Sequence, residues 1–374
     1  MTKTMGVGII GCGNISTDYM ELGPLFKGFT FRACADNNHE AATGLAEQFG
    51  IDAVSIDQLL QRDDIDIVLN LTTPAAHYEV LSRSLDCGKH VYSEKPFVLS
   101  QAEGIDLIDK ANKAKLRIGS APDTFMGASH QLARALVDRN RLGKILSGTA
   151  IVQGPGMESW HPNPDFFFLP GAGPVLDIGP YYVSNLVQLI GPVKEVMAMG
   201  SSPTSQRTIG DGPREGEQVP VKVDTTIHAL LRFQSGAQVT MITSWDVQSH
   251  SHGNMELYGE KGTLYIPDPN FFGGEVTYTE GDEIKTVSWD HPFAKLNYGD
   301  ENEHANYRCA GLADMALAIA EGRPHRCSAE FAHHVVDVMT GILTACETGK
   351  TVSINSSCEQ PEPVDGEAAR ALMV

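Results

Sequence analysis

The sequence lacks the features of a disulfide-bonded, metal-binding or membrane-spanning protein. Its seven cysteines are odd in number and scattered, and no two are spaced as C-x-x-C. This spacing argues against a disulfide framework and a zinc site, and it favours reduced thiols in a cytoplasm. No apolar run is long enough to cross a bilayer, and the first residues lack the cationic and apolar regions of a secretory signal.

Positive charge is also scarce, with 28 Lys and Arg against 47 Asp and Glu and a formal net charge of −19. Nucleic acids and anionic membrane surfaces would repel such a chain, so we expect neither as a partner. An anionic cofactor is still possible, because backbone amides at a helix N-terminus can hold a phosphate locally. Apolar residues make up 42% of the 374 residues, which is typical of a soluble globular protein with two domains.

Strands and helices alternate over the first third of the chain. Helix-like segments at residues 40–49, 77–87 and 101–114 separate short apolar runs at 7–10, 30–35, 65–71, 90–92 and 117–120. This order predicts parallel βαβ units with right-handed crossovers over residues 1–122.

The pattern changes in residues 123–374. A helix at 129–138 and final helices at 305–321 and 329–348 flank a series of strands, predicted at 145–152, 195–199, 225–233, 237–243, 254–258, 263–266, 275–279 and 284–289. Turn residues between several of these strands predict a large, mostly antiparallel sheet. We expect a loop at 201–220 and a weakly ordered tail after 354. The fold class is therefore α/β, with a different sheet in each of two domains.

A glycine-rich turn follows the first apolar run. Gly11 and Gly13 permit a tight turn and close approach of a pyrophosphate, and the helix that begins with Asn14 and Ile15 would present its amides to the phosphates. The third position of this fingerprint holds Ser16, which is small but not the usual glycine or alanine. The motif therefore predicts a dinucleotide site, although the match is imperfect.

Residues after the second and third strands extend this prediction. Asp36 can accept hydrogen bonds from ribose hydroxyls and would repel a 2′-phosphate, and no arginine follows it, which favours NAD over NADP. Thr72, Thr73 and Pro74 end the third strand, and His77 opens the next helix. We expect these residues to line the ribose and diphosphate of the cofactor, with a purely structural role for His77 as an equal alternative.

Lys95 follows the strand at 90–92, in the sequence Gly88-Lys89-His90-Val91-Tyr92-Ser93-Glu94-Lys95-Pro96. Proline cannot continue a central strand, so Lys95 is held at a carboxyl end, where open α/β sheets bind their ligands. Glu94 beside it is expected on the cofactor side.

Together these motifs resemble the Gfo/Idh/MocA family, the group of glucose–fructose oxidoreductase and inositol dehydrogenase. The resemblance spans roughly residues 5–355 and includes Gly171-Ala172-Gly173 before Asp177-Ile178-Gly179, and Glu347-Thr348-Gly349-Lys350-Thr351-Val352. It implies a Rossmann domain followed by an α/β domain with a large, mostly antiparallel sheet. It also implies NAD-dependent oxidation or reduction of a hydroxyl or carbonyl in a sugar or cyclitol.

The resemblance implies that Lys95 is the active-site lysine, which hydrogen-bonds the reacting oxygen. We expect nicotinamide and partial burial to lower the pKa of Lys95. The family pattern Asp-x-Gly-x-His reads Asp177-Ile178-Gly179-Pro180-Tyr181 here, so Tyr181 replaces the usual acid/base histidine. We expect Asp177 near a helix N-cap, one turn before Tyr181, with the pKa of Tyr181 lowered by Lys95.

His161 is a second candidate for the acid/base. It lies beside Trp160 and before Phe166-Phe167-Phe168, and aromatic faces interleaved with polar groups suit a sugar site. Structural roles remain open for each candidate: a plain N-cap for Asp177, a buried aromatic for Tyr181 and a loop histidine for His161.

Three functions agree with this sequence. The favoured one is an NAD-dependent sugar or cyclitol dehydrogenase. The others are a glycosidase that uses NAD transiently and a non-catalytic NAD-sensing protein. The outer face of a broad antiparallel sheet needs to be covered by other protein. We therefore also expect a homodimer or homotetramer that packs through this face.

Overall fold

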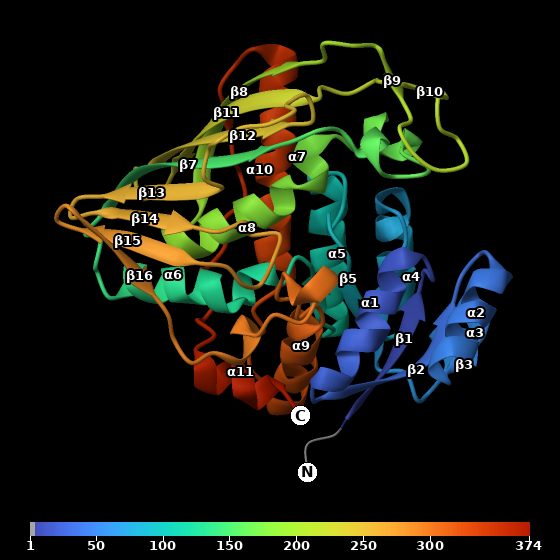
Figure 1. Ribbon diagram of the computed structural model, residues 1–374. Helices are drawn as coiled ribbons and strands as arrows, with labels where there is room; N and C mark the ends of the chain where they lie inside the picture. Colours follow the sequence, from blue (N-terminus) through green and yellow to red (C-terminus); the bar gives the residue numbers. More distant parts are fainter. Residues whose placement is uncertain (1–3) are drawn as a thin grey trace.

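The computed structural model describes residues 4–374, which form two sheets with helices packed around them (Figure 1). The first sheet has the order β3-β2-β1-β4-β5-β6, and all of its strand pairs are parallel. Its strands are β1 (Met5–Ile10), β2 (Phe29–Ala35), β3 (Asp52–Ala53), β4 (Ile67–Asn70), β5 (His90–Ser93) and β6 (Ile118–Ser120). The helices between them are α1 (Asn14–Leu22), α2 (His39–Phe49), α3 (Ile56–Gln61), α4 (His77–Asp86) and α5 (Gln101–Ala114). The predicted parallel βαβ architecture is confirmed.

The order of the strands positions the site. Both β1 and β4 are buried along their whole length, as expected for central strands covered by helices on both faces. After β1 the chain moves first to β2 on one side and later to β4 on the other. The carboxyl ends of β1 and β4 therefore border the crevice where such sheets bind ligands.

The second sheet has nine strands in the order β16-β15-β14-β13-β7-β12-β11-β8-β17, and only β7 and β12 pair in parallel. The strands are β7 (Ile145–Gln153), β8 (Val193–Ser201), β11 (Thr226–Phe233), β12 (Gln238–Ser244), β13 (Met255–Gly259), β14 (Thr263–Ile266), β15 (Val276–Glu280), β16 (Glu283–Val287) and β17 (Val352–Ser353). Helices α6 (Ala128–Asp138), α8 (Gly179–Ile190) and α10 (Ala329–Thr348) lie on its inner side (Figure 1). This confirms the large, mostly antiparallel sheet.

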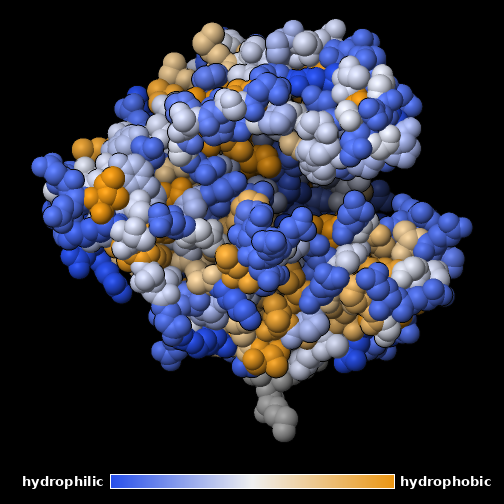
Figure 2. All heavy atoms as spheres, in the orientation of Figure 1, coloured by the Kyte–Doolittle hydropathy of each residue, from blue (hydrophilic) through white to orange (hydrophobic). Residues whose placement is uncertain are grey.

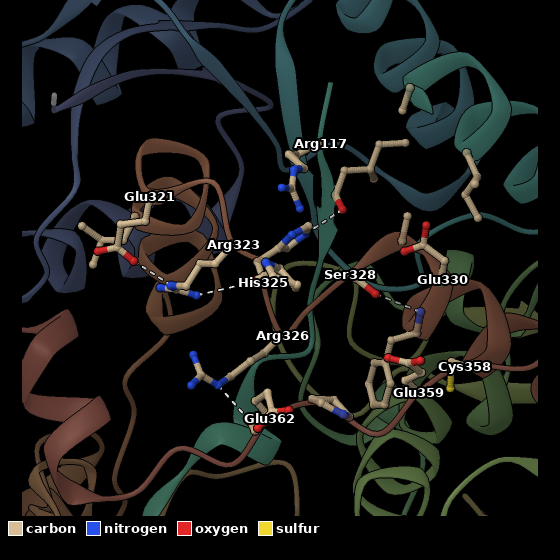
Figure 3. A pocket seen from close by; sticks show the side chains of 18 of the residues that line it. Arg117, Glu321, Arg323, His325, Arg326, Ser328, Glu330, Cys358, Glu359 and Glu362 are labelled. Atoms are coloured by element: carbon tan, nitrogen blue, oxygen red, sulfur yellow. Dashed lines mark hydrogen bonds and ion pairs between the residues drawn. The ribbon is translucent and has the colours of Figure 1, made fainter. Parts of the chain in front are cut away.

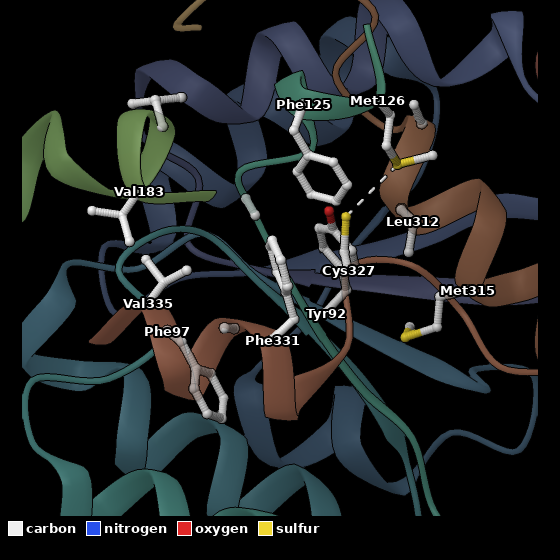
Figure 4. Close-up of a cluster of buried hydrophobic side chains, with 14 of the residues drawn as sticks. Tyr92, Phe97, Phe125, Met126, Val183, Leu312, Met315, Cys327, Phe331 and Val335 are labelled. Atoms are coloured by element: carbon white, nitrogen blue, oxygen red, sulfur yellow. Dashed lines mark hydrogen bonds between the residues drawn. The ribbon is translucent and has the colours of Figure 1, made fainter. Parts of the chain in front are cut away.

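The end of the chain packs back onto the first sheet. Helix α9 (Ala310–Glu321) and the start of α10 lie beside β6, and the Ser120 N–H donates to the Cys327 carbonyl at 3.0 Å. Figure 4 shows Cys327 and Phe331 packed against Tyr92 of β5 and Phe125. One apolar core therefore runs through both halves of the molecule, which fixes the two sheets relative to each other. None of the helices among residues 4–374 is both long and apolar enough to cross a membrane.

Three local predictions were wrong. Residues 201–220 contain the paired strands β9 (Gln206–Thr208) and β10 (Gln218–Pro220), because Ile209 and Val219 are buried against Trp245 and Phe168. The tail is ordered and contains α11 (Gly366–Leu372), which Asp365 caps and Leu372 anchors in the core. The helix predicted at 305–321 begins only at Ala310, because Cys309 has a φ of +94°.

Candidate functional site

The predicted site residues lie along the carboxyl edge of the first sheet. Figure 2 shows a hollow in the molecular surface at the right, between the lobe that carries α1, α2 and β2 and the lobe above it that carries β9 and β10. The carboxyl ends of the parallel strands face this hollow (Figure 1).

The glycine turn has the geometry that a dinucleotide requires. Gly11 has a φ of +101°, and a Cβ there would lie 2.6 Å from the backbone carbon of Leu71, so only glycine fits. At Gly13 a Cβ would meet no atom within 4 Å, which leaves open space directly before α1. Gly13 is the N-cap of α1 and offers no side-chain cap, so Asn14 and Ile15 begin a helix whose N-terminus can receive phosphate oxygens.

Ser16 and Asp36 hold this turn in place. The Ser16 hydroxyl donates to the Gly13 carbonyl at 2.6 Å, and its side chain is buried, so serine keeps the close helix–strand packing. Asp36 Oδ2 accepts the Cys12 N–H at 2.7 Å, and Oδ1 accepts the Asn38 N–H at 2.7 Å. Each carboxylate oxygen retains a second lone pair, so Asp36 can also accept from a ribose hydroxyl.

Hydrogen bonds with Asn70 and His77 hold the turn after β4. Asn70 Oδ1 accepts both the hydroxyl (2.7 Å) and the N–H (3.2 Å) of Thr72, next to Thr73 and Pro74. The ring nitrogens of His77 lie 3.0 Å from the Thr72 carbonyl oxygen and 2.7 Å from that of Pro96. His77 is fully buried and both of its nitrogens have partners in the protein, and its predicted contact with the cofactor stays a prediction.

Lys95 forms the centre of the ionisable cluster. Its ammonium donates to Asp177 Oδ1 and to the Asp177 carbonyl, each at 2.8 Å. Asp177 ends the short helix α7 (Pro174–Asp177), and α8 begins at Gly179. Asp177 lies next to Ile178, the N-cap of α8, as predicted, but its side chain turns to Lys95, so the alternative of a plain N-cap is wrong.

Tyr181 lies in the first turn of α8, with the Lys95 ammonium 5.3 Å from its ring centroid. The predicted proximity of Lys95, Asp177 and Tyr181 is therefore observed. The net pKa shift of each of these two groups, Lys95 and Tyr181, is upward, opposite to the predicted direction. Burial would lower the pKa of Lys95, but the charge and hydrogen bond of Asp177, together with Tyr181 and Glu94, raise it. Burial raises the pKa of Tyr181, and the charge of Lys95 reduces that rise only in part. Both groups are therefore protonated at neutral pH.

Glu94 connects this cluster to residues that the sequence analysis missed. Its Oε1 accepts the Tyr19 hydroxyl at 2.9 Å and lies 3.4 Å from Arg308 Nη1, while Oε2 accepts the Lys95 N–H at 3.0 Å. Burial would raise the pKa of Glu94, but the charges of Arg308 and then Lys95 lower it. Tyr19 has the apolar spacing of a core residue, and Arg308 lies in a segment without a motif, so the sequence carried no signal for either.

Trp160 and His161 lie on the other lobe, in an aromatic cluster separate from Lys95. The His161 ring packs edge-on against Trp160, Phe166 and Phe167, with centroid distances of 5.4, 5.6 and 5.3 Å. Its Nδ1 accepts the Asn163 N–H at 3.0 Å. Within residues 4–374, no hydrogen bond or ring contact joins His161 to Lys95, Asp177 or Tyr181. Their direct cooperation stays a prediction.

A separate cavity of about 1,470 Å³ lies at the opposite edge of the first sheet. Figure 3 shows Arg117, which precedes β6, together with Arg323, His325 and Arg326 on its walls. None of the predicted site residues lines it. This large cavity is therefore separate from the site around Lys95.

Two family models match this chain. The model described as "Oxidoreductase family, NAD-binding Rossmann fold" matches residues 5–121, and the model described as "GFO/IDH/MocA C-terminal domain" matches residues 130–265. These ranges contain the glycine turn, Asp36, Lys95, Asp177 and Tyr181.

Individual proteins and structures are also similar. Oxidoreductase P35 of Formosa agariphila is 22% identical over 306 residues, covering 78% of this chain and 87% of that protein. Myo-inositol 2-dehydrogenase of Thermotoga maritima is 24% identical, covering 74% of this chain and 80% of that protein.

Among solved structures, an NAD-binding oxidoreductase from Klebsiella pneumoniae has a TM-score of 0.81 at 20% identity, covering 95% of this chain and 100% of that one. A levoglucosan dehydrogenase in complex with NADH has a TM-score of 0.79 at 20% identity, with the same coverage. At these identities the structures establish the shared fold. With both family models matched in their expected order, the chain belongs to the GFO/IDH/MocA family of oxidoreductases with an NAD-binding Rossmann domain.

Proposed function

We propose that this protein is an NAD-dependent dehydrogenase that transfers a hydride between nicotinamide and a carbinol or carbonyl carbon of a sugar, sugar derivative or cyclitol. The observation that carries the proposal is the Lys95–Asp177–Tyr181 cluster at the same carboxyl edge of the sheet as a glycine turn that fits a dinucleotide. The relatives named as dehydrogenases of levoglucosan and myo-inositol support this class of substrate.

NAD is the proposed cofactor. The open space at Gly13 would receive the diphosphate, and the Asp36 carboxylate would accept from the adenosine ribose. The residues after Asp36 are Asn37 and Asn38, so no cation is present in sequence to bind a 2′-phosphate. When bound, the nicotinamide would supply or accept the hydride.

Lys95 would polarise the reacting oxygen. Two of its three N–H bonds are used by Asp177, which fixes the direction of the third. A fixed cationic donor stabilises the negative charge that develops on the oxygen in the transition state. Asp177 therefore has two roles: it orients Lys95, and its second carboxylate oxygen can hold a substrate hydroxyl.

Tyr181 is our proposed proton donor, with His161 as the alternative. A phenol with a raised pKa is protonated at neutral pH, so Tyr181 can donate to a carbonyl oxygen as the adjacent carbon receives hydride. Oxidation is the reverse: the tyrosinate that remains after this donation accepts the hydroxyl proton as the carbon loses hydride. A protonated Lys95 and a protonated Tyr181 are what carbonyl reduction requires at its start.

The protein is also proposed to be a homodimer or homotetramer. The outer face of the nine-stranded sheet exposes Met197 (52%), Met199 (80%) and Leu230 (39%). Leu230 pairs with Met197 across β11 and β8, so these side chains form one apolar strip. A second copy packed on this face would remove the strip from water.

The direct test is a turnover assay with NAD and a panel of polyols, sugars and cyclitols, followed by NADH absorbance. A dehydrogenase accumulates NADH in proportion to oxidised product. The same assay with glycosides tests the second hypothesis, because a glycosidase that uses NAD transiently would release aglycone without net NADH. Tight NAD binding without turnover on either panel would contradict both and favour the NAD-sensing hypothesis.

A further inference from the structure

Arg308 is held in an unusual position beside the proposed catalytic cluster. Its N–H donates to Asn306 Oδ1 at 3.1 Å, and Asn306 is in turn clamped to Asn297 by two hydrogen bonds of 2.8 Å. On its other side, Cys309 adopts a φ of +94°, a backbone conformation that is costly for any residue except glycine. The Cys309 thiol lies 3.5 Å from the Tyr19 carbonyl oxygen. This segment is therefore fixed on both sides of Arg308.

The side chain of Arg308 reaches the residues that surround Lys95. Its guanidinium carbon lies 5.9 Å from the centroid of the Tyr19 ring, and its Nη1 lies 3.4 Å from Glu94 Oε1. The charges of Lys95 and Arg308 both act on the Tyr181 hydroxyl and lower its pKa against the larger effect of burial. Arg308 is thus a second cation at the same site, with only 16% of its side chain exposed.

Its hydrogen-bonding capacity is largely unused. A guanidinium carries several N–H donors in a planar fork. Within residues 4–374, the only acceptor found for the Arg308 side chain is Glu94, at a distance that is long for a charge-assisted bond. Glu94 already accepts from Tyr19 and from the Lys95 backbone. None of the Arg308 nitrogens is a buried atom without a partner, so the unused donors are accessible to solvent.

Arg207 shows how this protein uses an arginine for structure. It is equally buried, but it pairs with both Glu158 and Asp246 and also donates to the Trp245 carbonyl. Asp123 is in electrostatic reach of Arg308, but its Oδ2 is occupied by the Gly311 N–H at 2.9 Å. Arg308 therefore lacks the set of partners expected for a structural guanidinium.

We propose that Arg308 binds a carboxylate of the substrate, so that the enzyme acts on a sugar acid, a polyhydroxylated carboxylate, in preference to the neutral sugar. This inference rests on the proposed dehydrogenase function and assigns its substrate class. The guanidinium fork matches a carboxylate in a bidentate way that an ammonium cannot. Lys95 is committed to Asp177 and to the reacting oxygen, so Arg308 is the cation left to bind an anionic group.

The charges at the site agree with this assignment. Lys95 faces Asp177 and Arg308 faces Glu94, so these two pairs are neutral overall before a substrate enters. A carboxylate substrate would add one negative charge, and the positive nicotinamide of the oxidised cofactor would balance it. Two points, the carboxylate at Arg308 and the reacting oxygen at Lys95, would fix which carbon faces the hydride acceptor.

The test compares matched pairs of compounds that differ only in the carboxylate: D-gluconate with D-glucitol, D-glucuronate with D-glucose, and D-galacturonate with D-galactose. We expect the acid of at least one pair to be oxidised with a kcat/KM about 100-fold above that of its neutral partner. Arg308→Gln should remove this preference, mainly through KM, so that kcat/KM falls far more for the acid than for its neutral partner. Arg308→Lys should restore part of it, and Arg141→Gln, an exposed arginine, should change nothing.

Calorimetry with the enzyme–NADH complex gives a second readout that does not depend on turnover. The acids should bind more tightly than their neutral partners, and Arg308→Gln should abolish the difference while circular dichroism shows an intact fold. Turnover of neutral compounds with no preference for acids would overturn the Arg308 assignment and leave the dehydrogenase function in place. An equal loss for acids and neutral compounds in Arg308→Gln would also overturn it, because the residue would then act by positioning Glu94. Absence of both turnover and acid binding across the panel would overturn both proposals.

Discussion

The Lys95 ammonium donates to two oxygens of one residue, the carboxylate and the backbone carbonyl of Asp177, each at 2.8 Å. This double contact joins the end of β5 in the first sheet to the end of α7, which comes 82 residues later. The cluster therefore exists only when both halves of the molecule are assembled. It also fixes the lysine in the protonated state, which suits a donor to the reacting oxygen.

Replacing Lys95 should separate catalysis from cofactor binding. Lys95→Ala removes the donor to the reacting oxygen, so we expect kcat to fall by about 10²- to 10⁴-fold. The affinity for NAD, measured by calorimetry, should change little, because the glycine turn and Asp36 are untouched. Lys113→Ala, at an exposed position in α5, is the matched control. Full turnover in Lys95→Ala would show that another residue polarises the substrate.

Two further variants decide which residue transfers the proton. Tyr181→Phe keeps the buried ring and removes only the hydroxyl, and we expect it to lower kcat by about 100-fold. His161→Ala should mainly raise KM, since His161 belongs to the aromatic cluster of the opposite lobe. Steady-state kinetics of both variants over a range of pH provide the measurement. The opposite pattern, with kcat lost in His161→Ala alone, would assign the acid/base role to His161.

Asp36 should determine the choice between NAD and NADP. Asp36→Asn keeps an oxygen that can accept the Cys12 N–H and removes the negative charge, so the affinity for NADP should rise about 10-fold relative to NAD. Asp36→Ala also removes the support of the glycine turn and should weaken binding of both cofactors. Dissociation constants for the two cofactors test this directly. Equal affinity of the unmodified protein for NAD and NADP would contradict the role of Asp36.

The sequence contained enough information for the fold and the cofactor edge because both depend on local patterns. Continuous apolar runs predicted the parallel strands, and the spacing of Gly11 and Gly13 predicted a turn whose geometry the structure confirms. The direction of the Asp177 side chain was not predictable, since it depends on a partner 82 residues away. The same holds for the pKa values of Lys95 and Tyr181, which depend on burial and on neighbours from several elements.

Arg308 shows a second limit of sequence reasoning. Its segment between β16 and α9 has no regular periodicity, and its position results from side-chain clamps between Asn297 and Asn306. Such clamps have no fixed spacing that a sequence pattern could reveal. By contrast, the errors at 201–220 and in the tail arose because turn-rich composition hid single buried residues such as Ile209 and Leu372.

The apolar strip on the outer face of the second sheet should control assembly. Leu230→Arg places a charge at the centre of the strip, between Met197 on β8 and Thr240 on β12, and should shift the protein towards monomer. Light scattering at micromolar concentration gives the molar mass. Ile105→Arg is the matched control, because Ile105 is also an exposed apolar residue and lies on α5, away from this sheet. A monomeric unmodified protein would contradict the assembly proposal.

Asp123 should make the stability of the protein depend on pH. Burial raises the pKa of Asp123 to about 6, above the ordinary aspartate value of ~3.9. The folded protein therefore holds this proton more tightly than the unfolded chain does. Its contribution to stability is fully present below pH ~4 and is lost as the pH rises to about 6, a change on the order of 3 kcal/mol.

Asp123→Asn mimics the protonated carboxyl and keeps an oxygen to accept the Gly311 N–H. At pH ~4 the variant and the unmodified protein should have similar free energies of unfolding in urea, and at pH ~7 the variant should be the more stable by up to about 3 kcal/mol. Asp282→Asn, at an exposed position between β15 and β16, should show no such divergence. If the difference between Asp123→Asn and the unmodified protein stayed constant across this range, the carboxyl of Asp123 would have to be ionised throughout. The structure would then require a closer cation than Arg308 to compensate its charge.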